Sequence, residues 1–141
     1  MSLAVCFTVP GKAVGKGRPR VSTIAGRPRL YTPATTVKWE QLVSDAARAA
    51  MGSQEPVEGP VSVRIAIDVQ IPQSWSKGRR KAAEDRQVHP GKPDLDNVAK
   101  AVLDALNGIC YQDDKQVVRL VVIKRYGVEP MVEVFLYEVM D

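Results

Sequence analysis

Hydrophobic and polar residues alternate most regularly between Val61 and Val69, where Val and Ile occupy every second position. Strict alternation over this length is typical of a strand that buries one face. Less regular apolar runs predict further strands at 4–9, 29–31, 117–125 and 131–139. The last two strands are separated by a turn at 127–130, so the chain should close with a hairpin.

A long helix is predicted from Pro33 to about Met51. Thr32 would cap its N-terminus, Pro33 has a backbone conformation suited to a first helical turn, and Gly52 follows the last turn. One apolar face of this helix is formed by Trp39, Val43, Ala46 and Ala50. A shorter, basic helix is predicted at 74–86.

Length and composition place the chain among globular proteins. It has 141 residues, of which 45% are hydrophobic and 26% charged, enough for one domain with a buried core. The order of strands and helices predicts a single α+β domain over residues 1–141, with helices packed on a mixed sheet. Two cysteines, no secretory signal and no apolar run of about 20 residues indicate a cytoplasmic protein without a membrane span.

The densest candidate chemistry lies around a third helix, predicted at 97–107 with Gly108 as its stop. Asp94 and Asp96 flank a single residue, so in an extended chain both carboxylates point to one side at the start of that helix. Lys100 follows Asp96 by four residues, which brings its ammonium onto the same face. Paired acids with a facing lysine indicate a divalent-metal site that acts on phosphate.

Asp113 and Asp114 can reach this cluster. The helix would be roughly 16 Å long, and the segment 108–114 spans about 20 Å when extended, so it can return along the helix toward Asp94. On a strand the two neighbouring acids would point to opposite sides, so only one of them is expected to bind the metal. Oxygen ligands without a cysteine or histidine pattern favour Mg²⁺ or Mn²⁺ over zinc.

A purely structural interpretation of these acids stays open. Asp96 would then be a helix cap, Asp94 a turn residue, and Asp113 and Asp114 part of a solvated loop. The convergence of four acids and one lysine in a chain of net charge +4 argues for the metal site.

The first 39 residues contain no acidic residue, which indicates a DNA-binding arm or hairpin. Lysine and arginine supply phosphate contacts that do not depend on base sequence, and interleaved glycines let the backbone approach a surface. The residues expected to contact DNA are Lys12, Lys16, Arg18, Arg20, Arg27 and Arg29. A second basic cluster at 77–81 is equally compatible with a solvated charge run, because Glu84 and Asp85 partly balance it.

Two motifs carry a family resemblance. The segments KPDLDNVAKAVLDALNG and DDKQVV, with VPGKAVGKGRPR and YTP near the start, resemble the RusA-type Holliday junction resolvases of bacteria and their phages. This resemblance implies a RusA-like fold in which Asp94, Asp96 and Asp114 bind Mg²⁺ and Lys100 assists the chemistry. Because the spacing to the Asp-Asp pair varies within the family, the choice between Asp113 and Asp114 stays open.

The resemblance also implies the activity. A homodimer would resolve a four-way DNA junction by two symmetric nicks, leaving 5′-phosphate and 3′-hydroxyl ends, with Mg²⁺ or Mn²⁺ but no small-molecule cofactor. Two alternatives remain: a non-catalytic junction- or DNA-binding protein, and another Mg²⁺-dependent phosphohydrolase.

Overall fold

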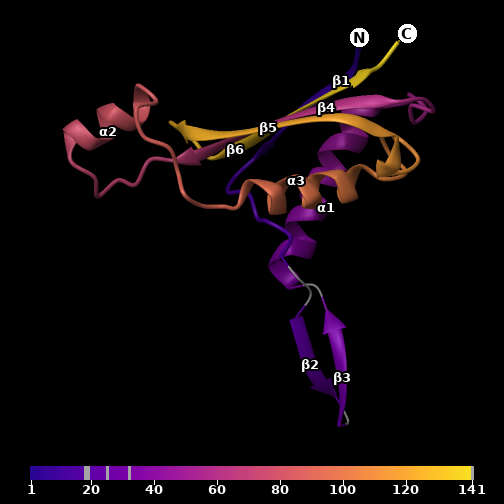
Figure 1. Ribbon diagram of the computed structural model, residues 1–141, viewed down its shortest axis with the longest axis horizontal. Helices are drawn as coiled ribbons and strands as arrows, with labels where there is room; N and C mark the ends of the chain where they lie inside the picture. The colour runs from indigo at the N-terminus through magenta and orange to yellow at the C-terminus, as the bar shows by residue number, and fades with distance from the viewer. Residues whose placement is uncertain (18–19, 25, 32, 141) are drawn as a thin grey trace.

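The computed structural model describes residues 1–17, 20–24, 26–31 and 33–140. Its centre is a four-stranded sheet of order β1-β6-β4-β5 (Figure 1). The four strands are β1 (Ser2–Pro10), β4 (Val61–Gln70), β5 (Val117–Gly127) and β6 (Met131–Glu138). β6 pairs antiparallel with both β1 and β4, whereas β4 and β5 run parallel, so the predicted mixed sheet is confirmed. The predicted closing hairpin is wrong, because β4 lies between β5 and β6 in the sheet.

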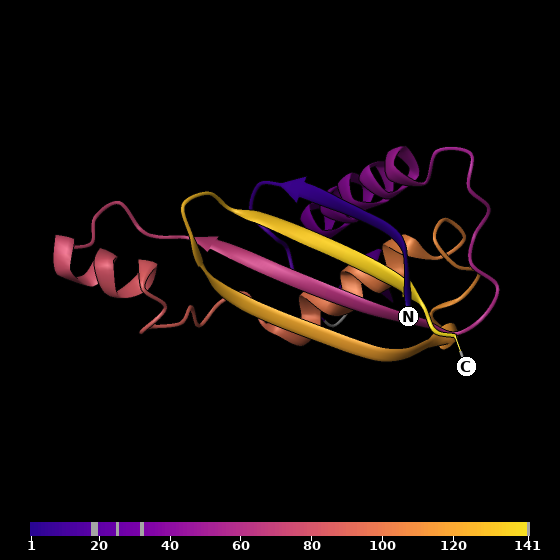
Figure 2. The same cartoon turned by 90° about the horizontal axis from the view of Figure 1, so that it is seen from above.

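Two helices cover one face of the sheet, α1 (Ala34–Met51) and α3 (Leu95–Leu106). Both lie on the same side in Figure 1, and from above no described helix covers the opposite face (Figure 2). A third helix, α2 (Lys77–Glu84), lies beyond one end of the sheet. The ring of Trp75, just before α2, packs edge-on against Tyr126 of β5, with the ring centroids 5.2 Å apart. This contact attaches the α2 segment to the sheet. The predicted α+β class is therefore confirmed.

The core lies between the sheet and the two helices. The alternating residues of β4 point into it, as the sequence predicts, and each fully buried Val or Ile contributes about 1.5–3 kcal/mol. The core side chains from β4, α1 and α3 include Val61, Val63, Ile65, Ile67, Trp39, Val43, Ala47, Val98, Val102 and Leu106. Of these elements, α3 carries the motif residues on its other side.

The parallel pairing of β4 and β5 explains where α3 lies. Parallel neighbours need a long crossover connection, and the chain from β4 to β5 contains α2 and α3. α3 begins at Leu95 with Asp94 at the N-cap, two residues before the predicted start. Asp96 is therefore within the first helical turn, and the extended geometry predicted for Asp94 and Asp96 does not occur.

The acid-free N-terminal region forms a strap and a hairpin. Residues 11–17 cross from β1 toward α3, and β2 (Arg20–Ile24) pairs antiparallel with β3 (Arg27–Tyr31). Figure 1 shows this hairpin projecting away from the sheet beyond α1. Pro33 is the N-cap residue of α1 and makes no side-chain cap, and the predicted cap Thr32 lies outside the described residues. No helix in the described ranges is long and apolar enough to cross a membrane.

Candidate functional site

A groove of about 550 Å³ runs between α3, β5 and the 3-10 turn η1 (Asp114–Gln116). Asp96 and Lys100 share one face of α3, as the spacing predicts, and both line the groove with Asp104 and Asp114. The apolar floor comes from α3 and β5 and consists of Leu95, Ala99, Leu103, Leu120 and Val122. Three carboxylates and one lysine thus surround a largely apolar depression.

Asp114 lies beside Asp104 rather than beside Asp94. Partial burial raises the pKa of the Asp114 carboxyl, and the neighbouring carboxylates of Asp113 and Asp104 raise this pKa further. Such crowding of like charges is relieved by a bound cation. The oxygen-only donor set of the groove therefore fits a hard divalent ion.

The loop at 108–114 is coiled, so it spans a shorter distance than an extended segment would. Gly108 N donates to Tyr111 O at 2.7 Å, and Cys110 N donates to Leu106 O at 3.1 Å. The Tyr111 side chain is fully buried and its hydroxyl donates to Leu103 O at 2.6 Å, so Tyr111 packs under the loop. The loop therefore returns along α3 only as far as Asp104.

Asp113 has a structural task that separates it from Asp114. Its carboxylate accepts a hydrogen bond from Lys115 N at 2.9 Å, which lowers the pKa of Asp113, and Gln116 Oε1 accepts from Asp113 N at 3.1 Å. This is a capping box, and Gln116 Nε2 also donates to Val57 O at 2.7 Å. The sequence reasoning missed Gln116, although its spacing from Asp113 is the signature of such a box. Asp113 thus holds η1 in place.

Asp94 lies outside the residues that line the groove. It is exposed at the N-cap of α3, and its Oδ2 accepts a hydrogen bond from Asn97 Nδ2 at 3.4 Å. Within the described ranges, no three Asp, Glu, His or Cys side chains converge closely enough to hold a metal ion. Asp96 and Asp114 therefore share the groove without forming a closed ligand cage.

Lys100 is exposed, and no carboxylate of the described residues forms an ion pair with it. Its position one turn after Asp96 leaves the ammonium available to an anion in the groove. A phosphate oxygen that entered beside Asp96 would meet this charge.

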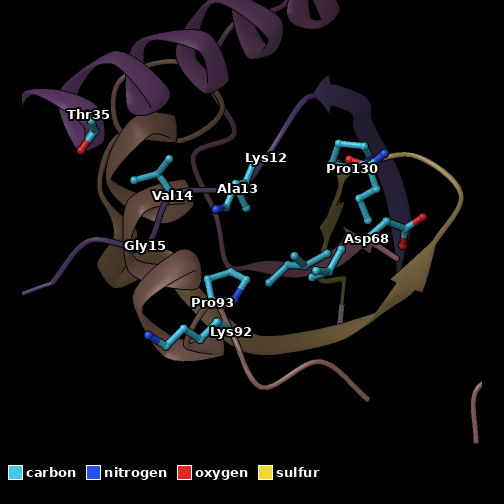
Figure 3. A pocket seen from close by; sticks show the side chains of 12 residues that line it. Lys12, Ala13, Val14, Gly15, Thr35, Asp68, Lys92, Pro93 and Pro130 are labelled. Atoms are coloured by element: carbon cyan, nitrogen blue, oxygen red, sulfur yellow. The ribbon is translucent and has the colours of Figure 1, made fainter. Parts of the chain in front are cut away.

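A second cavity, of about 660 Å³, lies at the start of α3 (Figure 3). Lys12 of the strap and Lys92, two residues before Asp94, both contribute to its lining, together with Pro93 and Pro130. Asp68 also lines this cavity, but its Oδ1 accepts a hydrogen bond from Arg125 Nε at 2.8 Å. The cavity is therefore lined by two lysines near the start of the motif helix.

The other basic residues expected to bind DNA are distributed along the strap and hairpin. Arg27 is exposed near the hairpin tip, only the backbone of Arg20 and Arg29 is described, and Arg18 lies outside the described residues. Lys16 has its ammonium 2.9 Å from Asp104 Oδ2 and 3.0 Å from Glu40 Oε1. Lys16 is therefore engaged within the protein.

Comparison with known proteins agrees with this geometry. The family model described as endodeoxyribonuclease RusA matches residues 10–137, which includes the strap, the hairpin, α3 and η1. The uncharacterized protein YqaN of Bacillus subtilis (strain 168) is 40% identical over 136 residues, covering 94% of this chain and 95% of YqaN. The chain belongs to the RusA family of endodeoxyribonucleases.

Proposed function

We propose that this protein is a Mg²⁺-dependent endodeoxyribonuclease that resolves four-way DNA junctions by paired, symmetric nicks. The observation that carries the proposal is the groove in which Asp96, Lys100 and Asp114 meet, in a chain that belongs to a nuclease family. A homodimer is part of the proposal, because a two-fold protein matches a two-fold junction. We expect it to act in the cytoplasm of a bacterium, encoded by the cell or by a phage.

Each residue of the site has a distinct task in this proposal. Asp94, Asp96 and Asp114 hold one or two Mg²⁺ ions, and Mn²⁺ is an acceptable substitute. When bound, the metal polarises the scissile phosphate and activates water. Lys100 lies beside Asp96 and neutralises charge that develops on the phosphate, or orients the attacking water. Hydrolysis leaves a 5′-phosphate and a 3′-hydroxyl.

One observation favours a second candidate function. The described side chains form no closed three-ligand cage, as expected for a DNA-binding protein without catalysis. Against this stands the groove itself, since a purely structural role requires neither the crowding of Asp104 and Asp114 nor the exposed Lys100 that shares the groove with them. A phosphohydrolase for small nucleotides would explain these acids but not an N-terminal region of 39 residues without an acid.

Incubation with an end-labelled four-way junction tests the proposal directly. We expect paired nicks at symmetric positions with Mg²⁺ and none with EDTA, at unchanged junction binding. Binding without cleavage at any Mg²⁺ or Mn²⁺ concentration would favour the non-catalytic protein, and hydrolysis of free nucleotides would favour the phosphohydrolase.

The arginines of the hairpin should determine how DNA affinity depends on salt. Replacing Arg20, Arg27 and Arg29 together with Gln is expected to weaken binding to junction and duplex alike, because a side chain that neutralises a phosphate releases counterions. The slope of log affinity against log salt should fall by about one unit for each phosphate that is no longer neutralised. Fluorescence anisotropy titrations over a series of salt concentrations measure this slope.

The control replaces an equal number of charges elsewhere, Lys77, Arg80 and Lys81 on α2. Its slope should equal that of the wild type, because α2 lies beyond the sheet, away from the hairpin (Figure 1). Equal slopes for all three proteins would mean that the hairpin does not contact DNA.

A further inference from the structure

The strap is attached to α3 by close backbone contacts. Lys16 N donates to Asn97 O at 2.9 Å. Gly15 lies so close that a Cβ at this position would be 2.8 Å from Asn97 Cβ, so only glycine fits without a shift. The Lys16 side chain therefore starts at the first turns of α3 and reaches along the helix.

Its ammonium lies between two carboxylates from different helices. Lys16 Nζ donates to Asp104 Oδ2 at 2.9 Å and lies 3.0 Å from Glu40 Oε1 of α1. The Glu40 contact is an ion pair rather than a well-directed hydrogen bond, because Glu40 Oε1 is buried and accepts no hydrogen bond from the described residues. The three side chains are only 21–28% exposed. The hydrogen bond with Asp104 raises the pKa of Lys16 against the opposing effect of burial, so the ammonium stays charged.

Asp104 connects this ion pair to the candidate site. It shares one side of α3 with Asn97, which meets the strap, and it also lines the groove with Asp96 and Asp114. The Asp104 charge is close enough to contribute to the raised pKa of Asp114. Any change in the charge or orientation of the Asp104 carboxylate therefore changes the electrostatic environment of Asp114, a proposed metal ligand.

We propose that Lys16 is a positioning residue of the nuclease site. Its ammonium engages the Asp104 carboxylate and keeps it out of the metal-binding set, so that the cation is held by the proposed ligands Asp94, Asp96 and Asp114. This inference rests on the proposed function. It gives Lys16 a different task from the phosphate contact that the sequence predicts, because a phosphate would have to displace two carboxylates from a half-buried ammonium.

Metal binding without DNA provides the test. Lys16→Met removes one positive charge and frees Asp104, so Mn²⁺ affinity, measured from the EPR signal of free Mn²⁺, should rise about tenfold, or a second ion should bind. Cleavage at saturating Mg²⁺ should nevertheless fall, because the ion moves toward Asp104. Lys16→Arg keeps the charge and should retain wild-type Mn²⁺ affinity.

The double variant Lys16→Met/Asp104→Asn separates positioning from stability. Removing the freed carboxylate should return Mn²⁺ affinity and stoichiometry to wild-type values, a coupling that loss of packing would not produce. Lys77→Met on α2 is the matched control, since Lys77 is exposed, has no ion-pair partner among the described residues and lies on a helix beyond the end of the sheet; its Mn²⁺ affinity should be unchanged. Circular dichroism establishes that every variant is folded.

The possible outcomes are distinct. Unchanged Mn²⁺ affinity in folded Lys16→Met, or failure of Asp104→Asn to reverse the change, would overturn the positioning role. A loss of junction affinity in Lys16→Met with a reduced salt slope and normal metal binding would restore the phosphate contact. A wild-type protein with neither Mn²⁺ binding nor Mg²⁺-dependent cleavage would overturn the proposed function and this inference together.

Discussion

Asp96→Asn and Asp114→Asn are each expected to lower the rate of junction cleavage by about a thousandfold, or about 4 kcal/mol in the activation barrier. Asparagine nearly keeps the shape of aspartate but loses the negative charge that a divalent cation requires. Junction affinity should stay equal or rise, because removing a carboxylate from the groove reduces its repulsion of phosphate. Single-turnover cleavage and gel-shift titration of the same samples measure the two quantities.

Asp113→Asn is the matched control because it makes the same chemical change one residue away. Its carboxylate caps η1 and is fully exposed, so we expect cleavage close to that of the wild type and a small loss of stability. Cleavage lost in Asp113→Asn but retained in Asp114→Asn would reverse the ligand assignment. Retained cleavage in Asp96→Asn would remove the basis for the metal site on α3.

Sequence periodicity predicts most elements of this fold. β4 is the clearest case, since its strict alternation leaves Val63, Ile65 and Ile67 fully buried against the helices. The sequences of β4 and β5 do not predict that these strands pair in parallel. Their pairing depends on how the long connection between them packs in the tertiary structure. β2, with the sequence RVSTI, was missed because five residues between Pro19 and Gly26 are too few to show a clear apolar alternation. β2 forms a strand through its antiparallel pairing with β3.

In the candidate site, too, local sequence patterns predict some features and tertiary contacts determine the others. Helical spacing correctly groups Asp96 with Lys100, because four residues make about one turn. Loop length correctly allows Asp114 to return to the groove that Asp96 lines, but not to Asp94 as predicted. Hydrogen bonds such as Gly108 N to Tyr111 O coil the loop and shorten its reach. The Lys16–Asp104 pair joins residues 88 positions apart, and no local pattern in the sequence indicates it.

Lys100→Ala should reduce the single-turnover rate on a four-way junction by about a hundredfold or more, with little change in junction affinity. Only interactions that are stronger in the transition state than in the ground state lower the barrier, and the contact proposed between the exposed Lys100 and the scissile phosphate is of this kind. Wild-type enzyme should cut the junction in both opposing strands within the lifetime of one complex and leave linear duplex of the same sequence intact. Assays on junction, splayed duplex and linear duplex at equal Mg²⁺ and salt give these rates.

Lys115→Ala is the control for the lysine, since Lys115 is exposed next to Asp114 but does not line the groove. It should cleave at nearly the wild-type rate, so that a general loss of positive charge cannot account for the effect at Lys100. If Lys100→Ala binds the junction weakly yet cleaves normally once bound, Lys100 is a phosphate contact and not part of the chemistry. If wild-type enzyme cuts linear duplex as fast as the junction, selectivity for four-way junctions is wrong. The proposed role of the groove acids would still stand, because the proposed metal-assisted hydrolysis does not depend on the shape of the DNA.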